Sequence, residues 1–371
     1  MAFIEKRGPG RWRARYRGPD GRERSQTFQR KIDAERWIVT QEADKARGAW
    51  VDPALGRTAF GAWAEEWLGL QVALKPKTRA GYEGILRAHL LPRFGSRPLA
   101  TIQPVDVRRY VAELEASGIA PRTVRNVTRV LSGVMRSAVA NRRLSSSPCV
   151  GVELPRPRQR QMVVLDAVEA QGLAEAAGPE HGPLITFAAY TGLRWGEIAA
   201  LRVGRFDPLR ASVDVVESAT EVAGGIRFVA PKNGRTRTVR LPRFLVDVLS
   251  PVVAGKGPEE LVFASRSGGP LRHGQFYRAF RRAVAAAGLD PRLRFHDLRH
   301  SAAAMLIAQG AHPRAIMERL GHSSITVTMD VYGHLLPSLD EALADGLDAT
   351  FRGALAASLR PGRGQVVELR G

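Results

Sequence analysis

The stretch RFHDLRHSAAAML, residues 294–306, is the most informative part of this sequence. We interpret it as the opening of a helix that runs through Met305 to Gln309. His296 and Arg299 are three residues apart, so both side chains project from one helix face. His300 directly follows Arg299 and faces another side of the helix, so we expect it to support a site rather than act in it. A His-x-x-Arg pair is common, and its meaning depends on the residues around it.

Towards the N-terminus, a second arginine follows a glycine turn. The apolar run 184–190 predicts a helix, the segment TGLRWGE at 191–197 predicts a bend, and a helix resumes over 198–201. Glycine tolerates left-handed backbone angles, so Gly192 would place Arg194 at an exposed helix start. We expect Glu197 to be an internal partner for a cation.

A lysine lies in a predicted β-region between these two arginines. Residues 212–216, 225–230 and 236–241 have strand-like patterns. An Asn-Gly pair between alternating runs is a strong hairpin signal, so Asn233-Gly234 predicts a hairpin with Lys232 at its lip. The chain has 49 arginines and only 7 lysines. A lysine here is notable because an ammonium can lose its proton whereas a guanidinium cannot.

Towards the C-terminus, a glycine-histidine pair is followed by a tyrosine. The segment LGHSS at 320–324 contains His322, and Tyr332 lies ten residues further on within MDVYGH at 329–334. A lone tyrosine is usually a packing residue, so Tyr332 indicates a function only together with the polar residues described above. Residues 347–359 predict a terminal helix.

The charge of the chain is large and unevenly distributed. The 371 residues carry a formal net charge of +20, with a sequence pI of about 11.1. Lys and Arg outnumber Asp and Glu by 14 to 8 in residues 1–57 and by 17 to 7 in residues 58–160, but only by 25 to 21 in residues 161–371. Such an excess usually implies a polyanionic partner, and nucleic acid ranks ahead of an anionic membrane.

Other sequence features indicate the compartment. No apolar run approaches the length of a membrane span, and residues 1–17 are too charged for a signal peptide. The single cysteine, Cys149, excludes an intrachain disulfide. We therefore expect a protein of the bacterial cytoplasm, associated with the nucleoid.

The first basic segment predicts a small sheet covered by a helix. RWRARYR at 11–17 alternates basic with apolar or aromatic residues, which is typical of a strand with two different faces. A turn at 18–21, a second strand at 22–28 and a helix at 31–47 follow. Arg11, Arg13 and Arg15 could reach DNA from the free face of the sheet. A surface domain with a solvated basic face is the alternative.

The second basic segment predicts only helices, at 58–70, 78–91, 105–117 and 122–142. Basic residues cluster at one helix start, where free backbone N–H groups favour phosphate, and recur along another helix as a stripe. These candidate DNA-binding residues are Lys75, Lys77 and Arg79 at the helix start and Arg122, Arg125 and Arg129 in the stripe. A solvated helix face is the alternative for the stripe. Residues 146–160, rich in proline and arginine, predict an extended linker.

The polar residues of the C-terminal half occur in a familiar order. Arg194, Lys232, the pair His296 and Arg299, His322 and Tyr332 together resemble the catalytic signature of the tyrosine recombinases, which include phage integrases and Xer-type recombinases. The resemblance covers about residues 160–345. The helical segment is similar to the core-binding domain of that family, and the first segment is similar to the three-stranded arm-binding domain of integrases.

The resemblance implies a multidomain α+β fold. We expect an arm-type DNA-binding domain of a small β-sheet and a helix at 1–57, an all-α core-binding domain at 58–145 and a linker at 146–160. A mainly α catalytic domain with a small antiparallel β-sheet would occupy 161–345, and residues 346–371 would form a C-terminal tail.

The residue types suit attack on a phosphodiester. Arginine forks can hold the non-bridging oxygens, and histidines can donate hydrogen bonds to them or assist proton transfer from the tyrosine. By resemblance, Lys232 protonates the departing 5′ oxygen and Tyr332 holds the DNA through a 3′-phosphotyrosine, so rejoining needs no ATP. Because the protein supplies the cations, no metal or other cofactor is expected.

Among the functions of this family, integration of a phage or mobile element fits best. A Xer-type chromosome-dimer resolvase is the first alternative, and the basic N-terminal segment argues against it. A non-catalytic DNA-binding regulator would have no reason to carry the complete polar set. A topoisomerase with the same chemistry is a third alternative. The expected partners are double-stranded DNA with core and arm sites, other copies in a DNA-bound homotetramer reached by the tail helix, and a directionality factor or DNA-bending protein.

Overall fold

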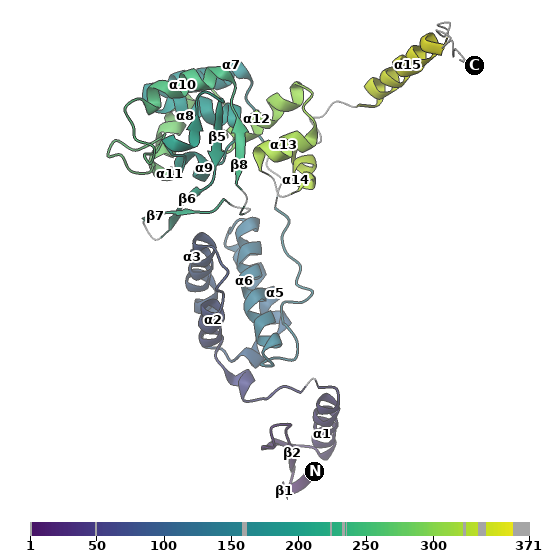
Figure 1. Cartoon of the computed structure of the whole chain (residues 1–371). Coiled ribbons are helices and arrows are strands. Elements are labelled where there is room, and N and C mark those ends of the chain that lie inside the picture. Colours follow the sequence, from purple (N-terminus) through teal and green to yellow (C-terminus); the bar gives the residue numbers. More distant parts are fainter. Residues whose placement is uncertain are drawn as a thin grey trace, which may run out of the picture. The chain divides into compact units, whose positions relative to one another are not determined.

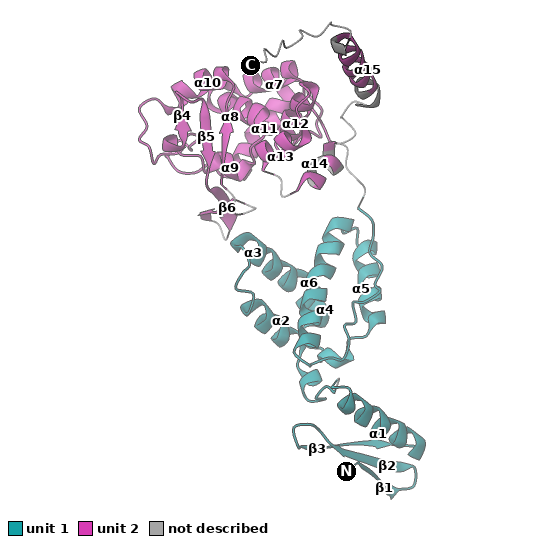
Figure 2. Ribbon diagram, turned by 45° about the vertical axis from the view of Figure 1, so that its right-hand side comes forward, with its two compact units in different colours: residues 1–160 teal, residues 161–371 magenta. Residues whose placement is uncertain are grey.

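The chain divides into two compact units, residues 1–160 and residues 161–371 (Figure 2). The structure is a computed structural model that describes residues 2–48, 50–157, 162–222, 225–231, 234, 236–321, 324–332 and 339–358. Each unit is described by itself. Among the described helices, none is long and apolar enough to cross a membrane.

The first unit begins with an antiparallel three-stranded sheet covered by one helix (Figure 1). The strands β1 (Phe3–Gly8), β2 (Arg11–Arg17) and β3 (Glu23–Phe28) lie in the order β1-β2-β3, and α1 (Lys31–Ala46) packs on one face. The apolar residues of β2 point to that helix: Tyr16 is fully buried, and its ring centroid lies 5.2 Å from that of Trp37. The predicted sheet and helix are confirmed.

The rest of the first unit is helical. Its helices are α2 (Phe60–Gly69), α3 (Pro76–Ile85), α4 (Leu91–Phe94), α5 (Pro104–Ala116) and α6 (Pro121–Ala140), with a π-helical turn at Leu86–Leu90 that makes α3 and α4 continuous. Three of these helices start at a proline, which suits the first helical turn because its N–H has no partner there. α6 buries an apolar stripe that includes Val127, Leu131 and Val134. The predicted all-α segment is confirmed.

The second unit surrounds a small sheet with helices (Figure 1). The helices are α7 (Ala167–Ala176), α8 (Gly178–Thr191), α9 (Trp195–Ala199), α10 (Arg243–Val253), α11 (His273–Ala286), α12 (Asp297–Ala308), α13 (Pro313–Leu320), α14 (Ile325–Tyr332) and α15 (Leu339–Ser358). The strands β4 (Phe206–Asp207), β5 (Ser212–Val215) and β8 (Arg237–Arg240) form an antiparallel sheet, and β6 (Ser218–Val222) pairs with β7 (Gly225–Val229). α8 lies at the centre of the apolar core, with Ile185 and Phe187 fully buried. The predicted mainly helical domain with a small antiparallel sheet is confirmed.

The hairpin predicted around Asn233-Gly234 is wrong. β8 pairs with β5, with Val239 opposite Val213, and β7 pairs with β6, with Val222 opposite Gly225. Alternation predicts a strand but not its partner, and β8 joins β5 because Val213 and Val239 are both buried in the core of the unit. The connection that contains Lys232 therefore joins two different sheets.

Candidate active site

Arg194 is positioned by a glycine turn between two helices. α8 ends at Thr191, and Gly192 has a left-handed backbone, with φ 65° and ψ 19°. Glycine adopts this conformation without a steric penalty, and it is the common way to end a helix. Arg194 then caps the N-terminus of α9, as predicted, but only 24% of its side chain is exposed.

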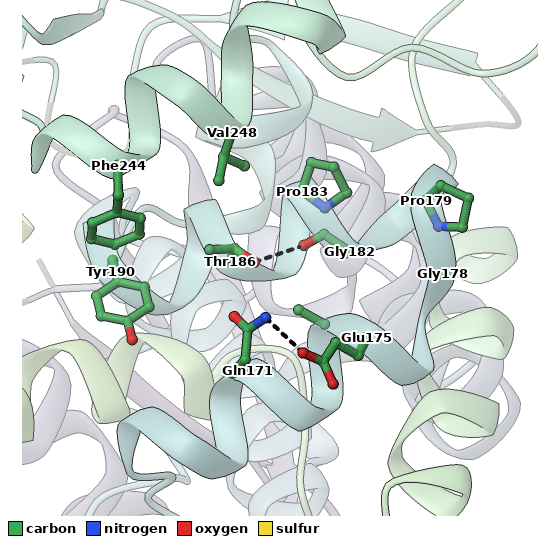
Figure 3. A pocket seen from close by; sticks show the side chains of 11 residues that line it. Gln171, Glu175, Gly178, Pro179, Gly182, Pro183, Thr186, Tyr190, Phe244 and Val248 are labelled. Carbon is green, nitrogen blue, oxygen red and sulfur yellow. Dashed lines mark hydrogen bonds between the residues drawn. The ribbon is translucent and has the colours of Figure 1, made fainter.

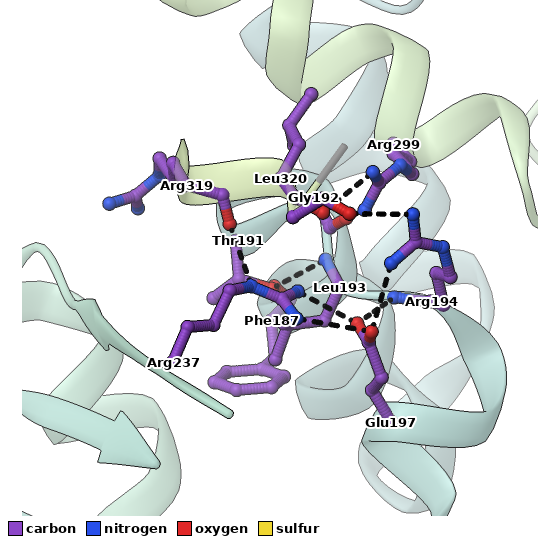
Figure 4. Close-up of polar contacts among 11 residues, drawn as sticks. Phe187, Thr191, Gly192, Leu193, Arg194, Glu197, Arg237, Arg299, Arg319 and Leu320 are labelled. Atoms are coloured by element: carbon purple, nitrogen blue, oxygen red, sulfur yellow. Dashed lines mark hydrogen bonds and ion pairs between the residues drawn. The ribbon is translucent and has the colours of Figure 1, made fainter. Parts of the chain in front are cut away.

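Arg299 projects from α12 into the interior, where two helices end. Its residue exposure is only 3%. Its guanidinium donates from Nη1 to the carbonyl oxygen of Gly192 and from Nη2 to that of Leu320, each at 2.7 Å (Figure 4). Gly192 caps α8, and Leu320 is the last residue of α13, whose C-cap Gly321 is also left-handed with φ 66°. Helix C-termini carry unpaired carbonyls and partial negative charge, so together they stabilise a buried cation.

A buried carboxylate connects Arg194 to a third arginine. Glu197 lies 3.0 Å from Nη1 of Arg194, and it accepts two hydrogen bonds from Arg237 of β8, at 2.8 and 3.1 Å (Figure 4). Arg194 also donates from Nη2 to the carbonyl oxygen of Gly321 at 3.0 Å. The expectation that Glu197 partners a cation agrees with this geometry, and the carboxylate serves two cations at once.

Tyr332 lies at the end of α14 and contacts α12. Its hydroxyl is 2.8 Å from Nδ1 of His300, and its residue exposure is 2%. Its ring packs in a small apolar cluster that includes Ile316 and Leu320. Leu320 thus belongs to the apolar cluster of Tyr332 and also accepts a hydrogen bond from Arg299 with its carbonyl, and the charges of Arg299 and Arg194 act on the tyrosine, so these residues form one site.

The electrostatics of the site combine burial with cations. Burial raises the pKa of Tyr332 to about 12, although Arg299 and Arg194 act in the opposite direction. Burial and the neighbouring Arg194 lower the pKa of Arg299 to about 9, so it remains charged at neutral pH. Burial also acts to raise the pKa of Glu197, but the hydrogen bonds and charge of Arg237 outweigh it, and the net pKa is lowered.

His296, the N-cap of α12, and His300, in the first turn of that helix, are neutral at neutral pH. Partial burial lowers the pKa of His296 to about 4, and the nearby His300 and Arg299 lower it further in the same direction. The residue as a whole is exposed, and contact with solvent weakens this shift. Burial likewise lowers the pKa of His300. A neutral imidazole has one N–H donor and one free acceptor, so each ring can accept a proton.

The structure assembles four of the six predicted catalytic residues: Arg194, His296, Arg299 and Tyr332. The other two, Lys232 and His322, lie outside the described residues. His300, which we expected to support the site, contacts the hydroxyl of Tyr332, and its ring centroid lies 5.3 Å from that of His296. Their spacing of four residues, which places two side chains on the same helix face, was the signal for it.

Arg237 was not predicted at all. It donates from Nε to the carbonyl oxygen of Arg319 at 3.1 Å, in addition to its two hydrogen bonds to Glu197. A Cβ on Gly321 would lie 2.9 Å from its guanidinium carbon. Nothing in the local sequence separates it from 48 other arginines, because its role depends on a partner 40 residues away.

The candidate DNA-binding residues of β2 lie on the sheet face opposite α1 or at its edge. Arg11 is exposed, and Arg13 donates to the hydroxyl of Ser25 at 2.9 and 3.1 Å. Arg15 forms ion pairs with Glu5 at 2.8 Å and Glu23 at 3.1 Å. The two carboxylates offset much of the charge of Arg15.

The basic residues at the start of α3 differ in their surroundings. Lys75 caps the helix, and Lys75 and Lys77 are exposed. Arg79 pairs with Glu83 at 3.2 Å and donates to the carbonyl oxygen of Leu68 at 3.2 Å. The charge of Arg79 is therefore partly offset by Glu83.

The stripe on α6 is exposed along its length. Arg122, Arg125 and Arg129 all face solvent, and none forms an ion pair with another described residue. Arg125 approaches the carbonyl oxygen of Pro155 at 3.5 Å. The opposite face of α6 is the buried apolar stripe, so the helix presents a cationic face to solvent.

A separate groove of about 680 Å³ lies between α7, α8 and α10 (Figure 3). Apolar side chains such as Phe244 and Val248 line it, and Gln171 donates to Glu175 at 2.9 Å on one side. No lysine or arginine is among its lining residues, and Glu175 would repel a phosphate. The groove therefore lacks the positive charge that a nucleic acid requires, whereas Arg194, Arg237 and Arg299 provide it.

Comparison with known proteins identifies the class. The phage integrase family matches residues 164–338, the N-terminal domain of phage integrases matches residues 3–47, and the N-terminal SAM-like domain of phage integrases matches residues 59–114.

Individual relatives match nearly the whole chain. The chain is 32% identical over 359 residues to a protein of Mycobacterium tuberculosis described as prophage phiRv2 integrase, covering 92% of this chain and 93% of that protein. It is 26% identical over 362 residues to the integrase of Mycobacterium phage L5, covering 93% and 96%. The tyrosine recombinase XerC of Alcanivorax borkumensis is 27% identical over 271 residues, covering 71% and 84%.

Solved structures share the fold. The Tn1549 transposon integrase in complex with a circular intermediate DNA superposes with a TM-score of 0.69 at 20% identity, covering 78% of this chain and 99% of that chain. A lambda integrase tetramer bound to a Holliday junction superposes with a TM-score of 0.58 at 19% identity, covering 88% and 94%.

The chain belongs to the phage integrase family of tyrosine recombinases. It is a DNA-breaking and rejoining enzyme, and within the family it is an integrase of the kind that phages and other mobile elements carry.

Proposed function

We propose that Tyr332 is the nucleophile of this recombinase and that it forms a 3′-phosphotyrosine with the cleaved strand. The observation that carries the proposal is the position of the Tyr332 hydroxyl in the field of Arg299 and Arg194, both of which lower its pKa against the effect of burial. Positive charge at this place stabilises both the forming phenolate and the phosphate that it attacks.

The other residues have roles in the same step. Arg194 and Arg299 hold the non-bridging oxygens of the scissile phosphate, and His296 and His322 donate further hydrogen bonds to them. Lys232 protonates the departing 5′ oxygen. The roles of Lys232 and His322 rest on the sequence motif alone.

A nicked suicide substrate tests the nucleophile, because the cleaved strand diffuses away and the covalent adduct accumulates. We expect the wild-type protein to form the adduct and Tyr332→Phe to form none. The matched control is Tyr277→Phe, because Tyr277 packs against His273 and Phe280 on α11, at the main core of the unit, whereas Tyr332 lies in a separate apolar cluster. An adduct with Tyr332→Phe would remove Tyr332 from this role.

The division of labour along the chain follows the same proposal. Residues 1–57 bind arm sites through Arg11, Arg13 and Arg15. Residues 58–145 bind core sites through Lys75, Lys77, Arg79, Arg122 and Arg125. Residues 146–160 link them to the catalytic domain at 161–345. A DNA substrate of this kind favours a protein of the bacterial cytoplasm that acts at the nucleoid.

The arm-binding role separates an integrase from a Xer-type resolvase. Deletion of residues 1–57 should abolish integration and leave cleavage of the core site intact, as measured on attachment-site plasmids and on the suicide substrate. Integration by the truncated protein would contradict the arm-binding role. Relaxation of plasmids that lack any specific site would instead favour a topoisomerase.

Assembly on DNA as a homotetramer completes the proposal. The lambda integrase tetramer bound to a Holliday junction is a precedent with the same fold. α15 has exposed apolar side chains at intervals of four residues, Leu347, Phe351 and Leu355, which is typical of a helix that packs against another surface. A directionality factor or DNA-bending protein would act on this assembly.

A further inference from the structure

His300 contacts the reacting atom of the proposed nucleophile. Its Nδ1 lies 2.8 Å from the hydroxyl oxygen of Tyr332, and the two ring centroids are 5.6 Å apart. His300 comes from α12 and Tyr332 from the end of α14, 32 residues later. The hydroxyl is thus within hydrogen-bond distance of a group that can take its proton.

The tyrosine needs such a group. Its pKa is raised to about 12 by burial, even with Arg299 and Arg194 acting in the opposite direction. The two arginines therefore do not deprotonate it before the reaction, and the proton has to leave as the oxygen attacks. A base already in contact with the hydroxyl removes the proton in that step.

The surroundings of His300 suit a ring that is neutral at rest and charged after the transfer. Burial lowers its pKa, so the free ring is neutral, and Nδ1 is an acceptor when the proton is on Nε2. Asp297, one turn earlier and only 1% exposed, acts in the opposite direction and stabilises the imidazolium. Arg294 and Arg299 oppose the charge, which favours return of the proton.

The position of His296 assigns it a different role. It is four residues before His300, its residue is exposed where His300 is half-buried, and the two ring centroids are 5.3 Å apart. His300 thus contacts the hydroxyl of Tyr332, and His296 lies nearer to solvent, on the side from which a DNA phosphate would approach. Two adjacent histidines can then divide proton transfer and phosphate binding between them.

We propose that His300 is a catalytic residue that accepts the Tyr332 proton during cleavage and returns it during rejoining. As the Tyr332 oxygen bonds to phosphorus, its O–H bond breaks and the proton moves to Nδ1 of His300. The bond from phosphorus to the 5′ oxygen breaks, and that oxygen takes its proton from the general acid assigned to Lys232. In rejoining, a 5′-hydroxyl attacks the phosphotyrosine and gives its proton back to Lys232, the bond from phosphorus to the Tyr332 oxygen breaks, and His300 protonates that departing oxygen. This inference rests on the proposed role of Tyr332.

The test is His300→Asn, measured as the cleavage rate of the suicide substrate. The asparagine side chain reaches the place of Nδ1 and keeps a hydrogen bond to Tyr332, but it cannot accept a proton at neutral pH. We expect cleavage to slow by about 10²- to 10⁴-fold, the usual contribution of a general base, with unchanged binding to core-site DNA. His296→Asn is the comparison variant: it removes the neighbouring histidine, which the proposed function places at the phosphate, so it should slow cleavage without the proton-transfer behaviour measured next.

A second measurement separates proton transfer from positioning. Difluorotyrosine at position 332 has a more acidic hydroxyl, so it depends less on a base. Introducing difluorotyrosine should accelerate cleavage in both variants, and the acceleration in His300→Asn should be at least about tenfold greater than that in His296→Asn. If His300→Asn does not fold, His300→Ala replaces it, and its cleavage rate should rise with added imidazole but not with a non-basic salt of equal ionic strength.

Three results would overturn the inference. Cleavage by His300→Asn within about threefold of the wild-type rate would exclude a proton-transfer role. Slow cleavage that does not respond to the acidic tyrosine, or to imidazole in the alanine variant, would make His300 a positioning residue. Faster cleavage would mean that the contact restrains Tyr332. In each case an adduct in the wild-type protein and its absence in Tyr332→Phe would leave the proposed function standing.

Discussion

Replacing Gly192 with alanine should damage both the stability and the chemistry of the catalytic unit. Gly192 has φ 65°, and a Cβ there would lie 2.4 Å from Cδ2 of Leu320 and 3.2 Å from Cβ of Ala302. Leu320 is fully buried, so its side chain cannot swing into solvent. The same glycine provides a carbonyl that holds Arg299.

The expected loss of stability has two parts. A left-handed backbone costs a non-glycine residue about 1–2 kcal/mol. Insertion of a methyl group into a packed core costs about 1–3 kcal/mol more. Gly192→Ala should therefore reduce the free energy of unfolding by about 2–5 kcal/mol. Any shift of Leu320 also moves the second carbonyl that holds Arg299, so cleavage should slow by about 10²-fold, as expected for a displaced catalytic group.

The matched control is Gly310→Ala. Gly310 follows α12, has φ 73°, and a Cβ there would meet no atom within 4 Å. This variant pays only the backbone cost of about 1–2 kcal/mol and should cleave normally. Pulse proteolysis of the full-length protein in urea measures the stability, read from how much of the fragment of residues 161–371 stays intact. The suicide substrate measures the cleavage rate. Equal losses in the two variants, or wild-type cleavage by Gly192→Ala, would refute the reasoning.

Three further predictions follow from a buried carboxylate, a half-buried thiol and a half-buried histidine. Glu197→Gln leaves two arginines without their carboxylate, and both arginines keep some contact with solvent, so it should reduce the free energy of unfolding by about 3 kcal/mol or somewhat less. Glu180→Gln, at an exposed ion pair, is the control and should change it by less than about 1 kcal/mol. Equal effects of the two variants in urea titrations would contradict this. Partial burial raises the pKa of Cys149 to about 11, so iodoacetamide at pH 8 should alkylate it about 100-fold more slowly than a model thiol of pKa 9. Labelling as fast as that of the model thiol, measured by mass spectrometry, would contradict the raised pKa. Because burial lowers the pKa of His300, the unfolded chain takes up a proton below about pH 6.5 that the folded protein does not. The free energy of unfolding should therefore fall as the pH drops from 7.5 to 5.5, and it should fall less in His300→Asn. An identical pH dependence of the urea midpoint in the two proteins would refute this.

The local sequence pattern predicted the elements around the site more accurately than it predicted which strands pair. The Gly192 turn, the N-cap position of Arg194 and the α12 helix agree with the local pattern, because each is set by a few adjacent residues. The hairpin around Asn233-Gly234 failed because strand pairing joins β8 to β5, more than twenty residues away. Local alternation carries no information on which distant strand offers a buried partner.

His300 shows the same limit at the level of one side chain. Its adjacency to Arg299 suggested a different direction, and its spacing from His296 was the better guide. Its contact with Tyr332 nevertheless depends on how α14 packs against α12, which no spacing within α12 reveals.

The sequence by itself determined the class of protein, the helices and the set of polar residues, because motifs, helix caps and charge are local properties that a chain carries in any conformation. Only the tertiary structure decided how those residues are used. The carbonyls that hold Arg299 come from 107 residues before it and 21 after it, Glu197 and Arg237 are 40 residues apart, and His300 meets Tyr332 across 32 residues. Such contacts form only when helices and strands from distant parts of the chain pack together, since packing, and not sequence order, decides which groups share a low-dielectric interior.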